Sequence, residues 1–421
     1  MKRYLREAYP VDFCRRRSTG VDPQALKTAA EMLAVIESDG EAAVRRYAAE
    51  YSELKTGESI QVSTQEIDAA VTSISVSDRE LLERTAGRIR MFAEAQRSCL
   101  QDLSIGIEGG TAGHRLVPVR AAGCYAPGGR YPLPSSVLMT VIPAKVAGVQ
   151  TIAVSSPNPS PVTLAAAYIA GADTVLRVGG VQAIAAFAFG LGGTPRCDMV
   201  VGPGNRFVTA AKFLLSSRIG IDLLAGPSEL LVIADESADP EIIAADLLAQ
   251  AEHDPESVPM LVSLSDRLCD TVNSALDRQL SSLPTRGTAE VALRNGFVCR
   301  VRSIEEAARL AEELGPEHLE LFVRDSSAAK NLFTNFGGLF IGGQSAEVFG
   351  DYGLGPNHVL PTGGTSRFSP GLSVATFLKQ RTWMELDSAV PASIVDDCAR
   401  LARLEALEGH ARACERRSVP R

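Results

Sequence analysis

At 421 residues the chain exceeds one ordinary hydrophobic core, and its length favours two α/β units with smaller appendages. Hydrophobic residues make up 45% of it and charged residues 22%, and no apolar run approaches the roughly 18 residues of a membrane span, so we expect no membrane partner. The net charge is −8 and no stripe of Lys and Arg carries interleaved aromatic residues, which argues against nucleic acid as a partner.

The first ten residues are basic but lack the apolar stretch and the small-residue cleavage site of a secretion signal, and we expect a cytoplasmic protein. The eight cysteines form no Cys-x-x-Cys pair, which argues against a thiolate zinc cluster and against a disulfide framework. We therefore expect free thiols that mostly serve packing.

Residues 22–100 alternate apolar and polar positions at helical spacing, as in Ala25–Ile36, and this pattern predicts a helical layer. From about residue 115, short β-rich runs such as Thr151–Val154 and Met199–Val201 alternate with Ala-rich segments. Strands that alternate with helices of this length indicate βαβ units around a parallel sheet.

A second set of elements follows, with Leu230–Ala234 and Met260–Leu264 as strands and Pro240–Ala251 as a helix. Two sheets are the economical interpretation, and the loop Ala225–Ser228 interrupts the pattern where one unit crosses to the other. After roughly residue 373 the chain becomes helical and charged.

Four of the five histidines lie in four short segments rich in Gly, Pro, Asp and Glu, and this clustering is the strongest signal for chemistry. Gln250 and His253 stand three residues apart near the end of a predicted helix, so both side chains project from one face and could share a ligand. The alternative is purely structural: His253 favours the dipole at the C-terminal end of a helix, and Pro255 ends that helix.

Two loops supply further candidates. Glu317 and His318 are adjacent beside a turn, and an acid next to a base suits proton transfer because His titrates near neutrality. A solvated turn is the alternative interpretation. Asp351 and His358 lie in a glycine-rich loop that no core strand or helix would tolerate, and such loops usually shape a site.

Glu405 and His410 stand five residues apart on the last predicted helix, on neighbouring faces that can reach a common target. A plain solvated helix is the alternative. Together Gln250, His253, Asp351 and His410 would supply nitrogen and oxygen ligands without a thiolate, a set that suits Zn²⁺, with Mn²⁺ or Co²⁺ as substitutes.

The signals for a nucleotide are weaker. Neither G-x-G-x-x-G nor G-x-x-x-x-G-K-[ST] follows a predicted strand, so no standard fingerprint is present. Glycine-rich turns at Gly179–Gln182 and Gly202–Asn205 do follow strands, and each opens a predicted helix whose first amides could face a pyrophosphate. Tight turns explain them equally well.

Six segments, in family order and spread over nearly the whole chain, resemble the histidinol dehydrogenase family. They are 123–139, 201–205, 225–229, 246–255, 316–321 and 355–362. The resemblance implies two Rossmann-like domains with parallel-rich sheets, plus small helical terminal segments, in an intertwined homodimer. The domains that we predict are an N-terminal arm (1–21), a discontinuous first domain (22–117 and 229–372), a second domain (118–228) and a C-terminal helical dimerisation segment (373–421).

The resemblance also implies a set of site residues with one zinc ion per subunit. The implied zinc ligands are Gln250, His253, Asp351 and His410. The implied acid/base pair is Glu317 and His318, and the implied NAD contacts are Tyr125, Gln182 and Asn205. The implied substrate pocket contains Ser228, Gln250, His253, His318, Asp351, His358, Glu405 and His410. In this picture Glu405 pairs with the substrate ammonium, and Glu405 and His410 reach the site of the partner subunit.

The implied reaction is the four-electron oxidation of L-histidinol to L-histidine, the last step of histidine biosynthesis, with two NAD⁺ used in turn and the aldehyde retained between them. Zinc would orient the substrate, His318 would take the alcohol proton as hydride leaves, and Glu317 would help to activate the water that adds to the aldehyde.

Tyr131 after Gly-Gly-Arg and Gly315 before Pro-Glu-His depart from the commoner family pattern. Relatives that oxidise other small alcohols, such as the sulfopropanediol dehydrogenases, share Gly-Gly-Arg-Tyr, so an NAD-dependent zinc dehydrogenase of another small polar alcohol is an alternative. A metal-dependent hydrolase, which would turn over without NAD⁺, and a non-catalytic scaffold are two further hypotheses.

Overall fold

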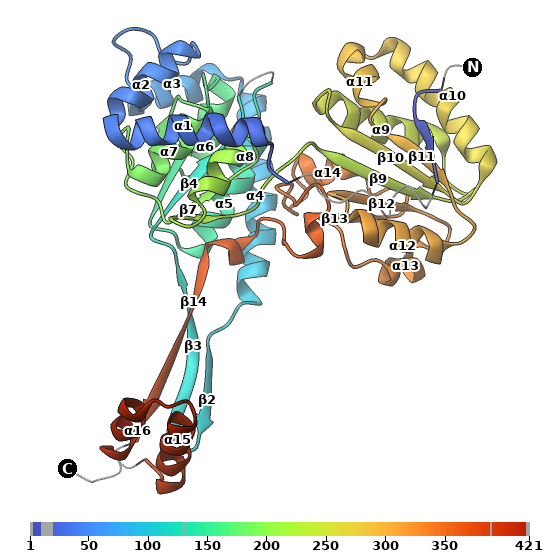
Figure 1. Cartoon of the computed structure of the whole chain (residues 1–421). Coiled ribbons are helices and arrows are strands. Elements are labelled where there is room, and N and C mark those ends of the chain that lie inside the picture. Colours follow the sequence, from blue (N-terminus) through green and yellow to red (C-terminus); the bar gives the residue numbers. More distant parts are fainter. Residues whose placement is uncertain (1–2, 10–19, 129–130, 388–389, 418–421) are drawn as a thin grey trace.

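The computed structural model describes residues 3–9, 20–128, 131–387 and 390–417, so Gly129, Arg130 and most of the predicted N-terminal arm lie outside the described residues. Figure 1 shows two α/β lobes and a long arm that projects away from the first lobe. The parallel sheets of the two lobes confirm the predicted fold class. In the described part of the chain, no helix combines the length and the apolarity that crossing a membrane requires.

The first lobe is built around five parallel strands in the order β6-β5-β4-β7-β8. The strands are β4 (Ala121–Tyr125), β5 (Thr151–Ser155), β6 (Thr174–Leu176), β7 (Met199–Val201) and β8 (Gly220–Ile221). The helices between them are α5 (Pro134–Ala147), α6 (Pro161–Ala170), α7 (Gly180–Phe189) and α8 (Arg206–Leu215). Numbered along the chain, the strand order is 3-2-1-4-5, so the order reverses between β4 and β7. The carboxyl ends of these two strands therefore form the crevice in which sheets of this kind bind ligands.

Four amphipathic helices of the N-terminal region pack on the first lobe. They are α1 (Pro23–Asp39), α2 (Glu41–Glu50), α3 (Thr64–Ser73) and α4 (Val76–Ser98). Helix α1 contacts α7 and α8, α3 contacts α6, and α4 contacts α5. The structure thus differs from the predicted division, in which residues 22–117 share a domain with residues 229–372. The apolar stripe of an amphipathic helix shows that it must be covered but not by which layer, so the pattern could not choose between the lobes.

The second lobe is built around six parallel strands in the order β1-β11-β10-β9-β12-β13. They are β1 (Arg6–Ala8), β9 (Glu229–Ala234), β10 (Val258–Ser263), β11 (Phe297–Arg300), β12 (His318–Phe322) and β13 (Gly338–Ile341). Its helices are α9 (Pro240–His253), α10 (Asp266–Ser282), α11 (Arg286–Ala292), α12 (Ile304–Leu314), α13 (Ser326–Ala329) and α14 (Glu347–Asp351). Apart from β1 at the edge, the order is again 3-2-1-4-5. Leu230 and Val232 pack into the core on one face of the sheet and Leu231 and Ile233 into the core on the other, which explains the continuous apolar run of β9.

The arm is a three-stranded antiparallel sheet that carries two helices at its far end (Figure 1). Its strands are β2 (Leu103–Ile107), β3 (Gly110–Pro118) and β14 (Leu378–Leu386), and its helices are α15 (Ala392–Leu404) and α16 (Glu408–Glu415). Strand β14 pairs with the whole of β3, from Leu378 opposite Pro118 to Leu386 opposite Gly110. The predicted C-terminal segment is therefore helical only at its end, and a nine-residue strand carries those helices away from both lobes.

Candidate functional site

The candidate site lies at the amino edge of the second sheet. Gln250 and His253 belong to the last turn of α9, His318 begins β12, and Asp351 ends α14. Because α9 connects two parallel strands, it runs back along the sheet, and its last turn returns to the edge at which the strands begin. Side chains that are up to 101 positions apart in the sequence thus meet at one edge, as the sequence analysis predicts for these four.

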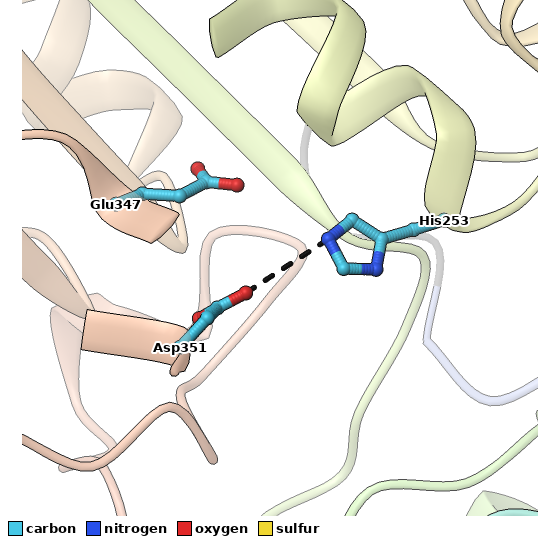
Figure 2. A group of neighbouring side chains, drawn as sticks. All are labelled: His253, Glu347 and Asp351. Carbon is cyan, nitrogen blue, oxygen red and sulfur yellow. Dashed lines mark ion pairs between the residues drawn. The ribbon is translucent and has the colours of Figure 1, made fainter. Parts of the chain in front are cut away.

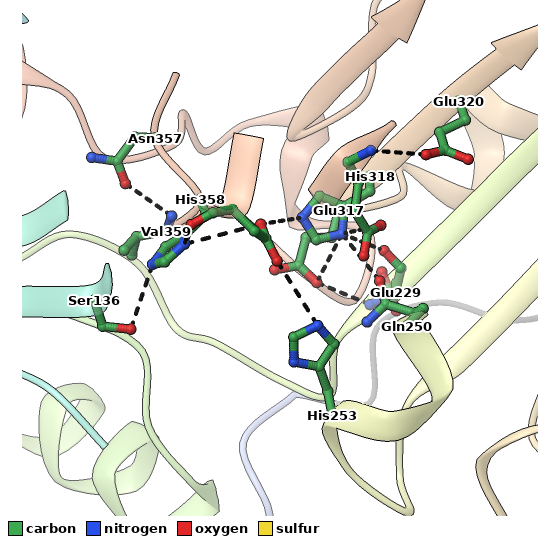
Figure 3. A network of polar contacts seen from close by, with 12 residues as sticks. Ser136, Glu229, Gln250, His253, Glu317, His318, Glu320, Asn357, His358 and Val359 are labelled. Atoms are coloured by element: carbon green, nitrogen blue, oxygen red, sulfur yellow. Dashed lines mark hydrogen bonds and ion pairs between the residues drawn. The ribbon is translucent and has the colours of Figure 1, made fainter. Parts of the chain in front are cut away.

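His358 links this edge to the first lobe. Its Nε2 atom lies 3.4 Å from Oγ of Ser136, in the first turn of α5, and its Nδ1 atom lies 3.1 Å from the backbone oxygen of Asp351 (Figure 3). Burial lowers the pKa of His358, which favours the neutral ring. The site therefore lies between the amino edge of the second sheet and the carboxyl edge of the first.

Three side chains at this edge form a group that could hold a metal ion (Figure 2). His253, Glu347 and Asp351 each offer one ligand atom, and these atoms all lie within 4.8 Å of one another. His253 Nε2 is 3.8 Å from Oδ2 of Asp351. Gln250 is buried beside them, and one terminal atom of its amide lies 3.2 Å from both carboxylate oxygens of Glu347 and 3.2 Å from Nδ1 of His318. Three of the four predicted zinc ligands are thus together.

Glu347 is the member of this group that the sequence analysis missed. It precedes Asp351 by four residues on α14, so the two carboxylates project from the same face of that helix. This i, i+4 spacing was the available signal. Burial, together with the nearby charges of Asp351, Glu320 and Glu317, raises the pKa of Glu347 well above its usual range.

His318 is buried with one ring nitrogen bonded and the other without a partner. Its Nδ1 atom lies 3.0 Å from the backbone oxygen of Glu229, so we place the ring proton on Nδ1, which donates to that oxygen. Its Nε2 atom has no hydrogen-bond partner among the described residues, and a carboxylate oxygen of Asp351 is 4.0 Å away. Burial lowers the pKa of His318, partly opposed by the charge of Asp351. The neutral ring therefore presents an unprotonated Nε2, the form that a general base needs.

Glu317 lies beside His318 but makes its own backbone contact. Its Oε2 atom accepts a hydrogen bond of 2.9 Å from the backbone N–H of Glu229, and burial raises its pKa well above the usual range of a carboxyl group. Glu229 is a second carboxyl group that the sequence analysis missed, although it follows Ser228 directly. Burial raises the pKa of Glu229 to about 7, and its side chain accepts a hydrogen bond of 3.1 Å from the backbone N–H of Gly363. Two carboxyl groups that can be neutral near physiological pH thus adjoin the base.

The residues predicted to contact NAD lie at the other edge, the carboxyl edge of the first sheet. Tyr125 ends β4 and is buried, and its hydroxyl oxygen accepts a hydrogen bond of 3.3 Å from the backbone N–H of Gly180. Burial raises the pKa of Tyr125 to about 12. Asn205 caps α8, and its side-chain oxygen accepts hydrogen bonds of 3.0 and 3.2 Å from two amides of the first turn. Gln182 is buried in the first turn of α7. Their contact with NAD stays a prediction.

Gly202, between Tyr125 and Asn205, shows how closely the chain packs at this edge. Its φ of +113° lies in the region that favours glycine, and a Cβ atom there would lie 2.0 Å from the backbone oxygen of Tyr125. Ser228 lies where the chain crosses to the second lobe, directly before β9, and its backbone oxygen accepts a hydrogen bond of 2.9 Å from Val258. Its role in the substrate pocket stays a prediction.

Glu405 and His410 are not part of the site within one chain. Both are exposed at the far end of the arm, away from α9 and β12 (Figure 1). The single chain therefore brings together three predicted zinc ligands and leaves the fourth, His410, elsewhere.

Comparisons with known proteins agree with this architecture. The sequence model of the family described as histidinol dehydrogenase matches residues 15–418. Over 406 residues the chain is 42% identical to the histidinol dehydrogenase of Thermus thermophilus, which covers 96% of this chain and 97% of that protein. It is 43% identical over 408 residues to that of Halobacterium salinarum, which covers 95% of each. The crystal structure of histidinol dehydrogenase from Elizabethkingia anophelis matches with a TM-score of 0.93 at 30% identity and covers 99% of this chain and 98% of that one. Sequence and fold thus agree over almost the entire length, and the chain belongs to the histidinol dehydrogenase family.

Proposed function

We propose that this protein oxidises L-histidinol to L-histidine through a bound aldehyde, with a zinc ion and two NAD⁺, as the last step of histidine biosynthesis. One observation carries the proposal: one His and two carboxylates lie together beside a buried base, His318, whose Nε2 atom has no hydrogen-bond partner in the described part of the chain. Membership of the family supports histidinol as the substrate over another small alcohol.

The donor set fits zinc. One imidazole, two carboxylates and one amide offer nitrogen and oxygen ligands, which suit Zn²⁺. Burial and the nearby carboxylate of Asp351 raise the pKa of Glu347 and so disfavour its negative charge, and a divalent cation bound there would favour the charged form. We propose that Gln250, His253 and Asp351 hold the ion, with Glu347 beside them. Zinc bound there would supply a Lewis acid that grips the imidazole and amino nitrogens of histidinol.

His318 is the proposed base for both oxidations. As hydride leaves the carbinol carbon for NAD⁺, Nε2 of His318 accepts the hydroxyl proton and the aldehyde forms. The hydrogen bond from Nδ1 to Glu229 holds the ring in the tautomer that leaves Nε2 free. Glu317 is the proposed partner for water: its raised pKa makes the carboxylate form a stronger base, and that form takes a proton from the water that adds to the aldehyde.

NAD⁺ is proposed to bind at the carboxyl edge of the first sheet, against Tyr125, Gln182 and Asn205. Helices α7 and α8 both begin at this edge, and the amides of a helix N-terminus favour the negative charge of a pyrophosphate. The contacts of His358 with Ser136 and with Asp351 connect this edge to the proposed metal ligands. The nicotinamide and the alcohol can thus meet between the lobes.

We further propose a homodimer in which the arm of each chain completes the site of the other. Leu401, Leu404 and Leu407 are 60%, 77% and 43% exposed at the end of the arm, and this apolar surface favours a protein partner. Glu405 directly follows α15 and His410 lies in α16, so both would then reach the second chain's site. Mixing His318→Gln with His410→Ala subunits tests this. Each variant alone should be inactive, and random re-pairing should restore roughly a quarter of the sites. If no activity returns while mixed dimers form, the shared site is wrong.

The experiment that tests the function is turnover of the purified protein with L-histidinol and NAD⁺, followed by NADH absorbance. We expect two NADH for each histidine formed and no turnover without NAD⁺. Sulfopropanediol serves as the competing substrate. Faster oxidation of sulfopropanediol than of histidinol would contradict the proposed substrate. Turnover as a metal-dependent hydrolase, without NAD⁺, would contradict the reaction class.

A further inference from the structure

The carboxyl edge of the first sheet carries an acidic group from an unexpected part of the chain. Nucleotide-binding sheets with this strand order usually place an Asp or Glu about 20 residues after the first turn, where it binds the ribose. This chain has no Asp or Glu between Tyr125 and Asp173. The strand β5 instead ends in Ser155, and Ser156 follows it. The usual ribose acceptor is therefore missing from the sheet itself.

Glu53 brings a carboxylate to the same edge from the N-terminal helical layer. It follows α2 and lies against the start of α7, where its Oε2 atom accepts hydrogen bonds from the backbone N–H of Gly179, at 3.0 Å, and from Nε2 of Gln182, at 2.8 Å. A Cβ atom on Gly179 would lie 2.8 Å from Oε1 of Glu53 and 2.8 Å from Cβ of Pro157, so a larger residue there would have to displace both neighbours. Within the described residues, Oε1 itself accepts no hydrogen bond.

Two buried oxygen atoms at this edge also have no hydrogen-bond partner among the residues that the structure describes. They are Oε1 of Gln182 and Oγ of Ser156, and both residues are 1% exposed. Pro157 connects the two positions, because Cβ atoms on Gly128 and on Gly179 would each contact it. Ser156, Gln182 and Glu53 thus lie at the ends of β5 and β6. A buried oxygen without a donor costs free energy, and ribose hydroxyl groups are donors.

The set favours a sugar diol over a phosphate. Glu53, Gln182 and Ser156 offer acceptor oxygens, and a 2′-phosphate has only acceptors and negative charge to set against them. Lys and Arg side chains, which normally accept a 2′-phosphate, make no bond to Glu53 or Gln182 in the described chain.

We propose that Glu53 makes the cofactor site select NAD⁺ over NADP⁺, by accepting a hydrogen bond from the adenosine ribose and repelling a 2′-phosphate. This inference rests on the proposed use of NAD⁺ at the first lobe. Glu53 contacts the start of α7 in the first lobe, whereas His253 and His318 belong to α9 and β12 of the second, so Glu53 should act on cofactor binding and not on the reacting groups.

Glu53→Gln tests the proposal, because it removes the charge and keeps the size and one acceptor oxygen. We expect the ratio of kcat/KM with NAD⁺ to kcat/KM with NADP⁺ to fall about tenfold or more, mainly through a lower KM for NADP⁺. Glu53→Asp keeps the negative charge but places it further from the ribose, because the side chain is shorter. This variant should still prefer NAD⁺ to NADP⁺, while its KM for NAD⁺ rises. Glu50→Gln, an exposed glutamate at the end of α2, is the matched control and should change neither value.

A binding measurement separates this proposal from the proposed function. The affinities for 5′-AMP and for adenosine 2′,5′-bisphosphate can be measured without turnover, by their competition with bound NADH. Glu53→Gln should raise the affinity for the bisphosphate only. In one outcome the natural protein oxidises histidinol, while the variant only loses thermal stability and keeps the same ratio of kcat/KM with NAD⁺ to kcat/KM with NADP⁺. Glu53 is then only a structural hydrogen-bond acceptor for α7, and the inference is overturned. If the natural protein fails to oxidise histidinol, the proposed function fails instead, and the competition still reports the selectivity.

Discussion

The two lobes share one strand order but present opposite edges to the site. The first lobe uses the carboxyl edge, where α5, α7 and α8 begin, and the second uses the amino edge, where α9 ends. Helix N-termini favour anions and helix C-termini favour cations. The first lobe is therefore suited to a pyrophosphate and the second to a metal ion. Because the carboxyl edge of one sheet faces the amino edge of the other, two lobes of the same topology provide one anion-binding edge and one cation-binding edge.

The largest effect is expected when a proposed metal ligand is removed from the amino edge of the second sheet. His253→Ala removes a donor from the group with Glu347 and Asp351, so zinc content and turnover should fall together. The loss of turnover should reach roughly a thousandfold, on the scale of the several kcal/mol that a metal ion contributes. Zinc analysis beside NADH production measures both.

The matched control for this change is His114→Ala, a histidine of the arm that contacts Gln380. It should retain both the zinc and the turnover. Full activity of His253→Ala without zinc would contradict the assignment of the ion to this edge.

A smaller loss is expected from His318→Gln, which keeps the bulk of the side chain but removes the free Nε2. General base catalysis contributes typically 10²- to 10⁴-fold, and we expect kcat to fall by about a hundredfold, at the lower end of that range. Because His318 belongs to the second lobe, the dissociation constant of NADH, measured by fluorescence, should stay the same. A weaker NADH affinity with unchanged kcat would reverse the roles that the two edges are given.

Sequence reasoning reached much of this arrangement, and its gaps have physical causes. The alternation of strands and helices predicted two parallel sheets. The family resemblance, more than the polar segments themselves, grouped Gln250, His253 and Asp351 with His410, which lies elsewhere in the single chain. Sequence reasoning missed Glu347 and Glu229, because a single carboxylate becomes informative only when burial and neighbours are known. It also assigned residues 22–117 to the second lobe, because the apolar face of a helix does not show against which sheet the helix packs.

A milder effect is expected at the carboxyl edge of the first lobe from Asn205→Ala. The side chain caps α8 through two amides, and losing such a cap typically costs about 1 kcal/mol. The freed first turn would also be less well placed to face a pyrophosphate. We expect KM for NAD⁺ to rise severalfold while KM for histidinol and zinc content stay the same. An equal rise of both KM values would mean that the two edges are not separate.

The smallest effect concerns the stability of the first lobe in acid. Glu66 accepts hydrogen bonds of 2.8 and 2.9 Å from Arg177, and these bonds are the main reason that its pKa is lowered to about 2 from the ordinary 4.5. A carboxyl group whose pKa is depressed by folding stabilises the protein above its unfolded pKa, and that stability is lost as pH falls from about 4.5 to about 2. The Glu66 side chain is 48% exposed, so solvent screening limits the contribution to less than about 1 kcal/mol.

Glu66→Gln isolates this ion pair, because Gln can still serve the capping box with Ser63 at the start of α3. The variant should unfold at a lower urea concentration at neutral pH, and its difference from the natural protein should vanish as the pH approaches about 2. Glu306 supplies the comparison from the second lobe: it occupies the same position of α12, and its carboxylate accepts a hydrogen bond from a backbone amide of Arg302 without an arginine side chain bonded to it in the described structure. Glu306→Gln should therefore cost less at neutral pH than Glu66→Gln. An equal cost at neutral pH would show that capping, rather than the pair with Arg177, stabilises the first lobe here.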